Sequence, residues 1–73
     1  MDYRSAKKIH INDELINKKT GEIVTVIAKD KFKHHGKKYI IIDCITKDNN
    51  FKRFTHLDLL EKKMMKKGDK YEK

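Results

Sequence analysis

Branched aliphatic side chains concentrate in two parts of the chain, residues 15–27 and 39–45. Each part contains short runs rich in Val, Ile and Thr that are bounded by polar residues, as is typical of strands. A later run alternates aromatic and polar or basic side chains, whereas residues 1–12 show no clear period. The pattern predicts strands at residues 14–18, 23–28, 39–45 and 51–56.

The run Tyr39–Ile45 gives the clearest strand prediction. Its apolar side chains are continuous, which indicates a strand buried on both faces, as in the middle of a small barrel. The segments between the predicted strands are polar. Lys19–Glu22 is expected to form a tight turn in which Gly21 adopts a positive φ, and Lys47–Asn50 a second turn.

Helical spacing follows the last predicted strand, over residues 57–65. Thr55 or Asp58 is placed to cap this helix at its N-terminus. Apolar side chains at i, i+3 and i+7 would lie on one face, and we expect them to close the open end of a barrel rather than to form a docking patch. These side chains are Leu57, Leu60 and Met64.

Residues 13–26, DELINKKTGEIVTV, resemble the opening hairpin of small SH3-like barrels. In those families a strand, a turn ending in Thr-Gly or a similar pair, and a β-branched strand begin a five-stranded roll. Residues 54–60 look like their closing strand and short helical turn. The resemblance covers about residues 13–61. It implies a mostly β fold: a small SH3-like barrel of four to five antiparallel strands with a short C-terminal helical segment.

The chain also resembles the short, lysine-rich accessory proteins of phages and prophages of low-GC Gram-positive bacteria. That resemblance implies either nucleic-acid binding or interference with a host protein. We expect a flexible N-terminal arm at residues 1–12, a barrel domain at 13–65 and a basic solvated tail at 66–73. No stretch reaches the roughly 20 apolar residues of a membrane span, and Cys44 is the only cysteine. We therefore expect a cytoplasmic protein.

Positive charge narrows the choice of partner. The chain has 19 Lys and Arg against 11 Asp and Glu, a formal net charge of +8 on 73 residues. A polyanion suits such a surface, because each neutralised phosphate releases a condensed counterion. Five of the lysines fall in the predicted connection between residues 29 and 38, where aromatic rings interleave with or flank them.

This connection is the strongest candidate for a binding site. Its ammonium groups can pair with phosphates, while an aromatic ring can stack on an exposed base. The alternative is a solvated loop whose lysines keep a small protein soluble. The candidate nucleic-acid-binding residues are Lys29, Lys31, Phe32, Lys33, Lys37, Lys38, Tyr39 and Arg53.

Arg53 has two possible roles. Its planar guanidinium suits phosphate, and it suits equally an ion pair with Asp43 or Asp48. Because strand side chains alternate, Lys52 and Arg53 must occupy opposite faces, so at most one can extend the surface of the basic connection.

Catalysis and metal binding are not expected, and no cofactor is implied. His34 and His35 are adjacent, a spacing that rarely directs both imidazoles to one ion, and no Cys-x-x-Cys or His-x-x-x-His pair exists. Cys44 lies in the strongest predicted strand, where burial makes a thiol unreactive. Ser5 is the only serine, and a fold of this size lacks a second layer to enclose a substrate.

The leading hypothesis is a monomeric or homodimeric, non-catalytic module that contacts the backbone of DNA or RNA with little sequence specificity. With about five phosphates engaged, log affinity would fall with log salt at a slope near −4 to −5 on duplex DNA. The rival hypothesis is an inhibitor or adaptor that binds a host protein such as a polymerase or a defence nuclease.

Overall fold

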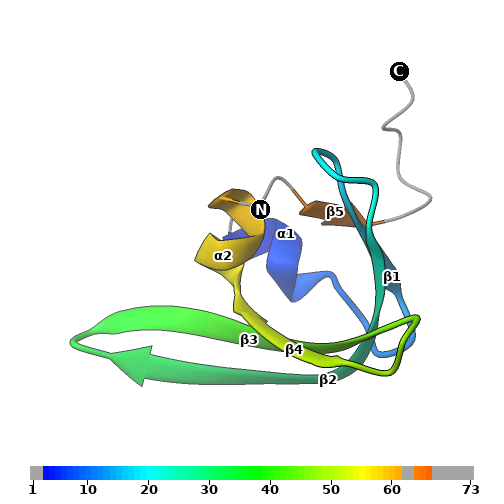
Figure 1. The fold of residues 1–73 in the computed structure, drawn as a ribbon. Coiled ribbons are helices and arrows are strands. Elements are labelled where there is room, and N and C mark those ends of the chain that lie inside the picture. Colours follow the sequence, from blue (N-terminus) through cyan, green and yellow to red (C-terminus); the bar gives the residue numbers. More distant parts are fainter. Residues whose placement is uncertain (1–2, 62–63, 67–73) are drawn as a thin grey trace.

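The structure is a computed structural model that describes residues 3–61 and 64–66. Within these residues five antiparallel strands form one open sheet, accompanied by two short helices (Figure 1). In chain order the elements are α1 (Tyr3–Lys7), β1 (Glu14–Asn17), β2 (Ile23–His34), β3 (Lys37–Thr46), β4 (Phe51–Thr55), α2 (His56–Glu61) and β5 (Met64–Lys66). The predicted mostly β class is therefore confirmed.

The sheet has the strand order β4-β3-β2-β1-β5 and curves around its inner face, on which both helices lie (Figure 1). A β-bulge contributes to this curvature. Val26 of β2 pairs with Cys44 of β3, but the next pair joins Ala28 to Asp43, so Ile27 is an extra residue in β2. Such a residue bends the strand that carries it and increases its twist.

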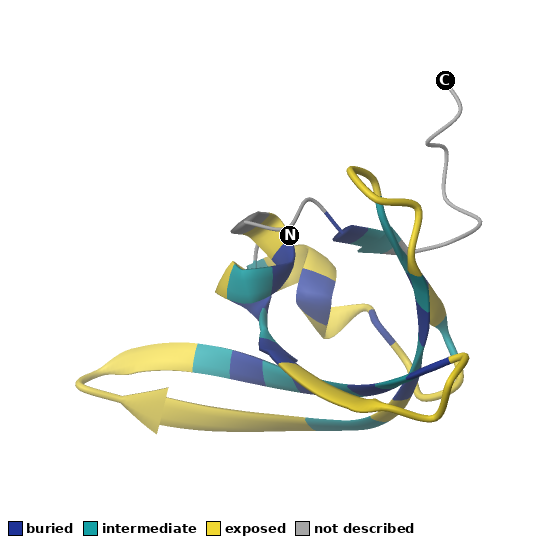
Figure 2. Cartoon of the chain, in the orientation of Figure 1, coloured by how far each residue is buried: buried dark blue, intermediate teal, exposed yellow. Residues whose placement is uncertain are grey.

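The core fills the concave side of the sheet (Figure 2). Along β3, burial alternates: Ile40, Ile42 and Cys44 are inaccessible to solvent, whereas the residues between them, such as Ile41, are only partly buried. The prediction that this strand is buried on both faces is thus wrong. Its outer face has no second layer among the described elements, so isoleucines there remain partly exposed.

The N-terminal segment contributes to the core, which differs from the expected flexible arm. Ala6 is 0% exposed and Ile9 is 1% exposed. Tyr3, Ala6 and Ile9 are spaced three residues apart, so α1 and the residues that follow it direct all three side chains toward the concave face. There α1 contacts β3 and α2. A curved sheet of this size needs such a cover, because its inner apolar side chains would otherwise face water.

A capping box starts α2. The backbone N–H of Asp58 donates to the Thr55 hydroxyl (3.2 Å), and the backbone N–H of Thr55 donates to the Asp58 carboxylate (2.9 Å). Both predicted capping residues therefore act together. This start rotates the helix so that Leu59 is buried, while Leu57 and Leu60 stand 51% and 56% exposed.

The expected lid over residues 57–65 is therefore different in the structure. The helix ends at Glu61, and Met64 belongs to β5, where it pairs with Asn17 of β1 and is buried. The core contacts come from Leu59 and Met64, from two different elements. Most of the predicted tail, residues 67–73, lies outside the described part of the chain.

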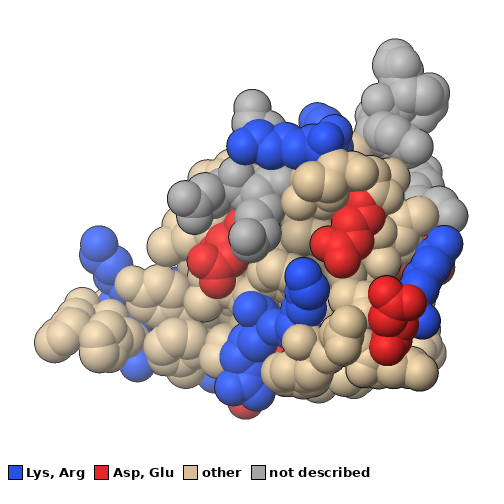
Figure 3. Space-filling model, viewed as in Figure 1, with Lys and Arg blue, Asp and Glu red and all other residues tan. Residues whose placement is uncertain are grey.

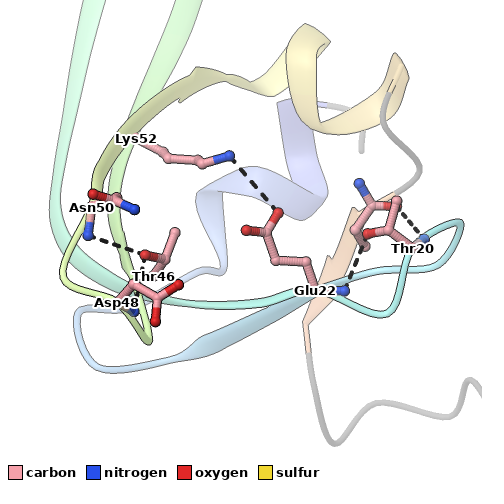
Figure 4. Close-up of polar contacts among 7 residues, drawn as sticks. Thr20, Glu22, Thr46, Asp48, Asn50 and Lys52 are labelled. Atoms are coloured by element: carbon pink, nitrogen blue, oxygen red, sulfur yellow. Dashed lines mark hydrogen bonds and ion pairs between the residues drawn. The ribbon is translucent and has the colours of Figure 1, made fainter.

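Both predicted turns are present. At the β1–β2 turn the Asn17 carboxamide accepts the backbone N–H groups of Lys19 (2.8 Å) and Thr20 (3.3 Å), and Gly21 has a φ of 80°, as expected. At the β3–β4 turn the Thr46 hydroxyl accepts backbone N–H groups from Asp48 and Asn50 (Figure 4). These side chains act as local turn acceptors, which explains why short-range patterns located both turns.

His56 links α2 to the sheet. It is 8% exposed, its ring meets that of Tyr3 edge to face at 5.4 Å, and its Nδ1 accepts a long hydrogen bond of 3.5 Å from the Ile40 N–H. This acceptor lies where β4 has left β3, so it pairs a backbone donor that the sheet would otherwise leave unpaired.

We expect His56→Ala to lower the free energy of unfolding by about 1–3 kcal/mol, because it removes a buried ring and the acceptor of the Ile40 amide. The exposed His10 provides a matched control: His10→Ala should change stability by less than about 0.5 kcal/mol. Urea denaturation of the two variants measures the difference. Equal stabilities would contradict the assigned role of His56.

Candidate nucleic-acid interface

The basic connection predicted between residues 29 and 38 is not a loop. β2 continues to His34 and β3 begins at Lys37, so only His35 and Gly36 form the turn. Both turn residues have positive φ, 51° and 78°, the conformation that two-residue hairpins require. The loop prediction was wrong because residues 29–38 contain no β-branched residue, so cross-strand pairing and not intrinsic preference holds them extended.

The outer half of this hairpin projects from the body (Figure 1). β1 pairs with β2 only at residues 23–25, and β4 pairs with β3 only at residues 41–45. Residues 31–39 are therefore paired with each other and with no third described strand. We call residues 31–39 the ribbon. It contains four lysines and no acidic residue.

The register divides the predicted site residues between two faces of the ribbon. Lys31 lies opposite the buried Ile40, and Lys33 lies opposite Lys38. Since directly opposed residues share a face, these three lysines extend the inner, core-facing surface of the sheet. Lys37 is next to Lys38 on β3, and because side chains alternate along a strand, it points to the outer face. The predicted cationic surface thus has three lysines on one side and one on the other.

The two predicted aromatic residues do come together, on the outer face. Phe32 and Tyr39 are directly opposed, with ring centroids 5.0 Å apart and planes inclined by 15°. Phe32 is 41% exposed. The ring centroids of Tyr39 and His56 also lie 5.8 Å apart, so ring contacts connect the base of the ribbon to the body. The exposed ring of Phe32 remains available for stacking.

The ammonium group of Lys29 has a structural role and is not free to contact a ligand. Its Nζ donates hydrogen bonds to the backbone carbonyls of Lys7 (2.7 Å) and Ile9 (2.8 Å). The last carbonyls of a helix have no partner within the helix, and a cation is favourable there. Lys29 therefore holds the end of α1 against β2, a role that the sequence did not indicate because no helix was expected at residues 3–7.

Arg53 forms the ion pair that was one of its two predicted roles. Its Nε and Nη2 donate to the two carboxylate oxygens of Asp43, at 2.7 and 3.2 Å, across neighbouring strands. The hydrogen bond and the charge of Asp43 raise the pKa of Arg53 above its ordinary value. The pair lies on the outer face of the body, not on the ribbon.

Lys52 points to the opposite, inner face, as the alternation predicted. Its ammonium group lies 3.9 Å from the Glu22 carboxylate, across the end of the curved sheet (Figure 4). Both side chains are nearly half exposed, so this pair contributes at most about 1 kcal/mol. Lys52 and Arg53 each face an acid, which separates them from the lysines of the ribbon.

The ribbon lysines have no such partners. Among the described residues, no carboxylate lies within ion-pair distance of Lys31, Lys33, Lys37 or Lys38. On the face drawn in Figure 3, the acidic side chains lie over the body, and the projecting ribbon carries none. A shallow hollow of about 280 Å³ lies beside the inner face of the ribbon. Its lining residues are Tyr3, Lys31, Phe32, Lys33 and Lys38.

Tyr3 was not among the predicted site residues. The available signal was the three-residue spacing of Tyr3, Ala6 and Ile9, which is compatible with one helical face. A five-residue helix without acidic residues in its first turn gives too weak a pattern to be read alone. Its position beside the ribbon depends on tertiary packing.

Other chemistry has little structural support in the part of the chain described. No three His, Cys, Asp or Glu side chains gather there in a way that could hold a metal ion. None of the helices seen is long and apolar enough to cross a bilayer. Cys44 is fully buried, and burial, together with the neighbouring Asp43 charge, raises the pKa of its thiol to about 12.

Comparisons with protein-family models, with curated proteins and with solved structures each find no significant match. The ribbon and the hollow are therefore the features from which a function can be inferred.

We expect the Cys44 thiol to resist an aromatic disulfide reagent at pH 8 in the native protein and to react fully in denaturant. The raised native pKa also has a stability consequence. Protonated Cys44 stabilises the native state fully below the ordinary thiol pKa of 9.0, and this stability is lost as the pH rises toward 12. Cys44→Ala should lack this component when unfolding free energies are compared across that range. Rapid native labelling would contradict the burial.

We expect Lys29→Met to destabilise the protein by about 1–2 kcal/mol, because it keeps the aliphatic stem but leaves two carbonyls without their donor. Lys31→Met is the matched control on the same face of β2, and it should change the unfolding free energy by less than about 0.5 kcal/mol. Equal effects in thermal or urea unfolding would show that Lys29 does not hold α1.

Proposed function

We propose that this protein is a small, non-catalytic SH3-like module that binds the phosphate backbone of nucleic acid through its ribbon, in the cytoplasm. The SH3-like assignment is supported by the strand order. β2, β3 and β4 form a meander, a short helix follows β4, and β5 returns to pair with β1. In this arrangement the ribbon is an extension of the central hairpin and stands clear of the body.

The observation that carries the proposal is the unbalanced charge of the ribbon. Four ammonium groups project on two strands with no acid among residues 31–39 and no ion-pair partner among the described residues. Like charges held close on one strand pair destabilise the folded protein. Phosphates between them remove that cost, and the released counterions add to the affinity.

The shape of the ribbon suits the same partner. A two-stranded β-ribbon is narrow enough to enter the major groove of duplex DNA, about 12 Å wide. The ribbon offers lysines rather than a set of amides or guanidinium groups aimed at base edges. Lysine contacts to phosphates position a protein without reading sequence. The expected behaviour is binding with little sequence preference and a strong dependence on salt.

A second candidate function is binding to a host protein, as the resemblance to phage accessory proteins implies. The observation in its favour is that Leu57 and Leu60 stand about half exposed on α2. The two functions are separated by pull-down from host lysate with nuclease present. One stoichiometric protein retained by the wild type and lost in Leu57→Ser/Leu60→Ser would favour the protein partner.

For the wild-type protein on a duplex, we expect log affinity to fall with log salt at a slope between about −2.7 and −3.6, since three to four phosphates are engaged. This slope is shallower than the sequence alone suggested, because Lys29 and Arg53 are already paired. Lys31→Gln/Lys33→Gln/Lys38→Gln should reduce the magnitude of the slope by about 2 to 3 and abolish binding at physiological salt. Fluorescence anisotropy at several salt concentrations measures both quantities.

The matched control is Lys18→Gln/Lys19→Gln/Lys47→Gln, which removes the same charge from exposed turns of the body. It should retain most of the affinity and most of the slope. Equal losses in the two triple variants would reduce the proposal to a general effect of net charge. Absence of salt-dependent binding by the wild type would overturn it.

A further inference from the structure

A shallow hollow lies between the ribbon and α1, and it is lined by three lysines and two aromatic residues. Its volume is about 280 Å³, enough for a phosphate group and part of the sugar or base attached to it. From the ribbon it is lined by Lys31, Phe32, Lys33 and Lys38, and from the helix by Tyr3. Tyr3, near the N-terminus, and residues 31–38, in the middle of the chain, therefore meet at one place.

The arrangement of the three lysines is electrostatically unfavourable without a ligand. Lys33 and Lys38 are directly opposed in the register, and Lys31 lies on the same face two residues from Lys33. The nearest acid along the strand, Asp30, pairs with Ile41, which places it on the other face. No described carboxylate pairs with any of these lysines. The hollow thus concentrates positive charge that an anion would neutralise.

The wall opposite the lysines is fixed in place. The ring of Tyr3 packs edge to face on His56 at 5.4 Å, and the Lys7 ammonium lies 5.9 Å from its centroid. Lys29 anchors the end of the same helix through two hydrogen bonds. A cavity wall that is held by the core is preorganised, which lowers the ordering cost when a ligand binds.

We propose that this hollow is a discrete phosphate-binding subsite, in which Lys31, Lys33 and Lys38 contact the phosphate oxygens and Tyr3 packs on the attached sugar or base. The inference rests on the proposed function when the phosphate belongs to a nucleic acid. The same chemistry would also take the phosphate of a free nucleotide or inorganic phosphate, and the two sources are separated below. The outer-face Lys37 contributes little to this subsite.

Neighbouring lysines provide the test, because Lys37 and Lys38 are adjacent and exposed but lie on opposite faces of the same strand. Either Gln substitution removes one charge from the ribbon. Lys38→Gln should weaken binding of a fluorescent oligonucleotide about fivefold at near-physiological salt and reduce the salt slope by about 0.9. Lys37→Gln should weaken it less than about twofold and leave the slope nearly unchanged.

A measurement without nucleic acid gives an independent readout. In chloride, Lys38→Gln should raise the melting temperature by about 1–4 °C, since it removes the like-charged partner of Lys33. Lys37 lies opposite His34, so Lys37→Gln should leave the melting temperature unchanged. When inorganic phosphate replaces chloride at constant ionic strength, the wild type and Lys37→Gln should be stabilised, and Lys38→Gln should not.

The outcomes separate the phosphate subsite from nucleic-acid binding. Equal loss of oligonucleotide affinity in Lys37→Gln and Lys38→Gln would overturn the subsite while leaving the ribbon as the binding element. Phosphate stabilisation that requires Lys38, without any binding of oligonucleotides by the wild type, would support the subsite with a free phosphate compound as its ligand and would overturn nucleic-acid binding. If phosphate fails to stabilise the wild type and both variants lose the same oligonucleotide affinity, the subsite is overturned, both for nucleic acid and for a free phosphate compound.

Discussion

The pairing of β2 with β3 is the constraint on which both the core and the candidate site depend. The two strands are paired from Val24–Thr46 inside the body to His34–Lys37 at the tip, with a single shift of register at Ile27. Because side chains alternate along paired strands, the face that buries Ile40 and Ile42 continues outward as the face that carries lysines. The position of each lysine relative to α1 is therefore set by the packing of the core and by the bulge at Ile27.

Local interactions account for what the sequence predicted well. Gly21 marks a turn because few other residues tolerate its backbone conformation, and Thr55 and Asp58 mark a helix start because each pairs with the other's backbone. The strands at the centre of the sheet are rich in β-branched residues. In these cases the information lies within a few residues of the element that it specifies, so a single sequence is sufficient.

Contacts between distant parts of the chain account for what the sequence did not predict. α1 is five residues long and is stabilised by burial of Ala6 and by Lys29, 22 residues from the carbonyl of Lys7 that it contacts. β5 has three residues and exists as a strand because it pairs with β1. The candidate site has the same limit: the sequence predicts a polar connection at residues 29–38, and nothing in it divides the lysines between two faces. Lys29 is bonded to backbone carbonyls at the end of α1. Of the two roles predicted for Arg53, the ion pair with Asp43 is the one that forms.

The open sheet leaves β4 paired only with β3 among the described strands, so its other edge presents unpaired backbone groups. An edge of this kind is a template for self-association, particularly with the exposed Phe51 on the same strand. Lys52 and Arg53 occupy the centre of that strand and place a positive charge on each face. A second molecule approaching edge to edge would have to bring its own charged side chains against these, which disfavours pairing through this edge.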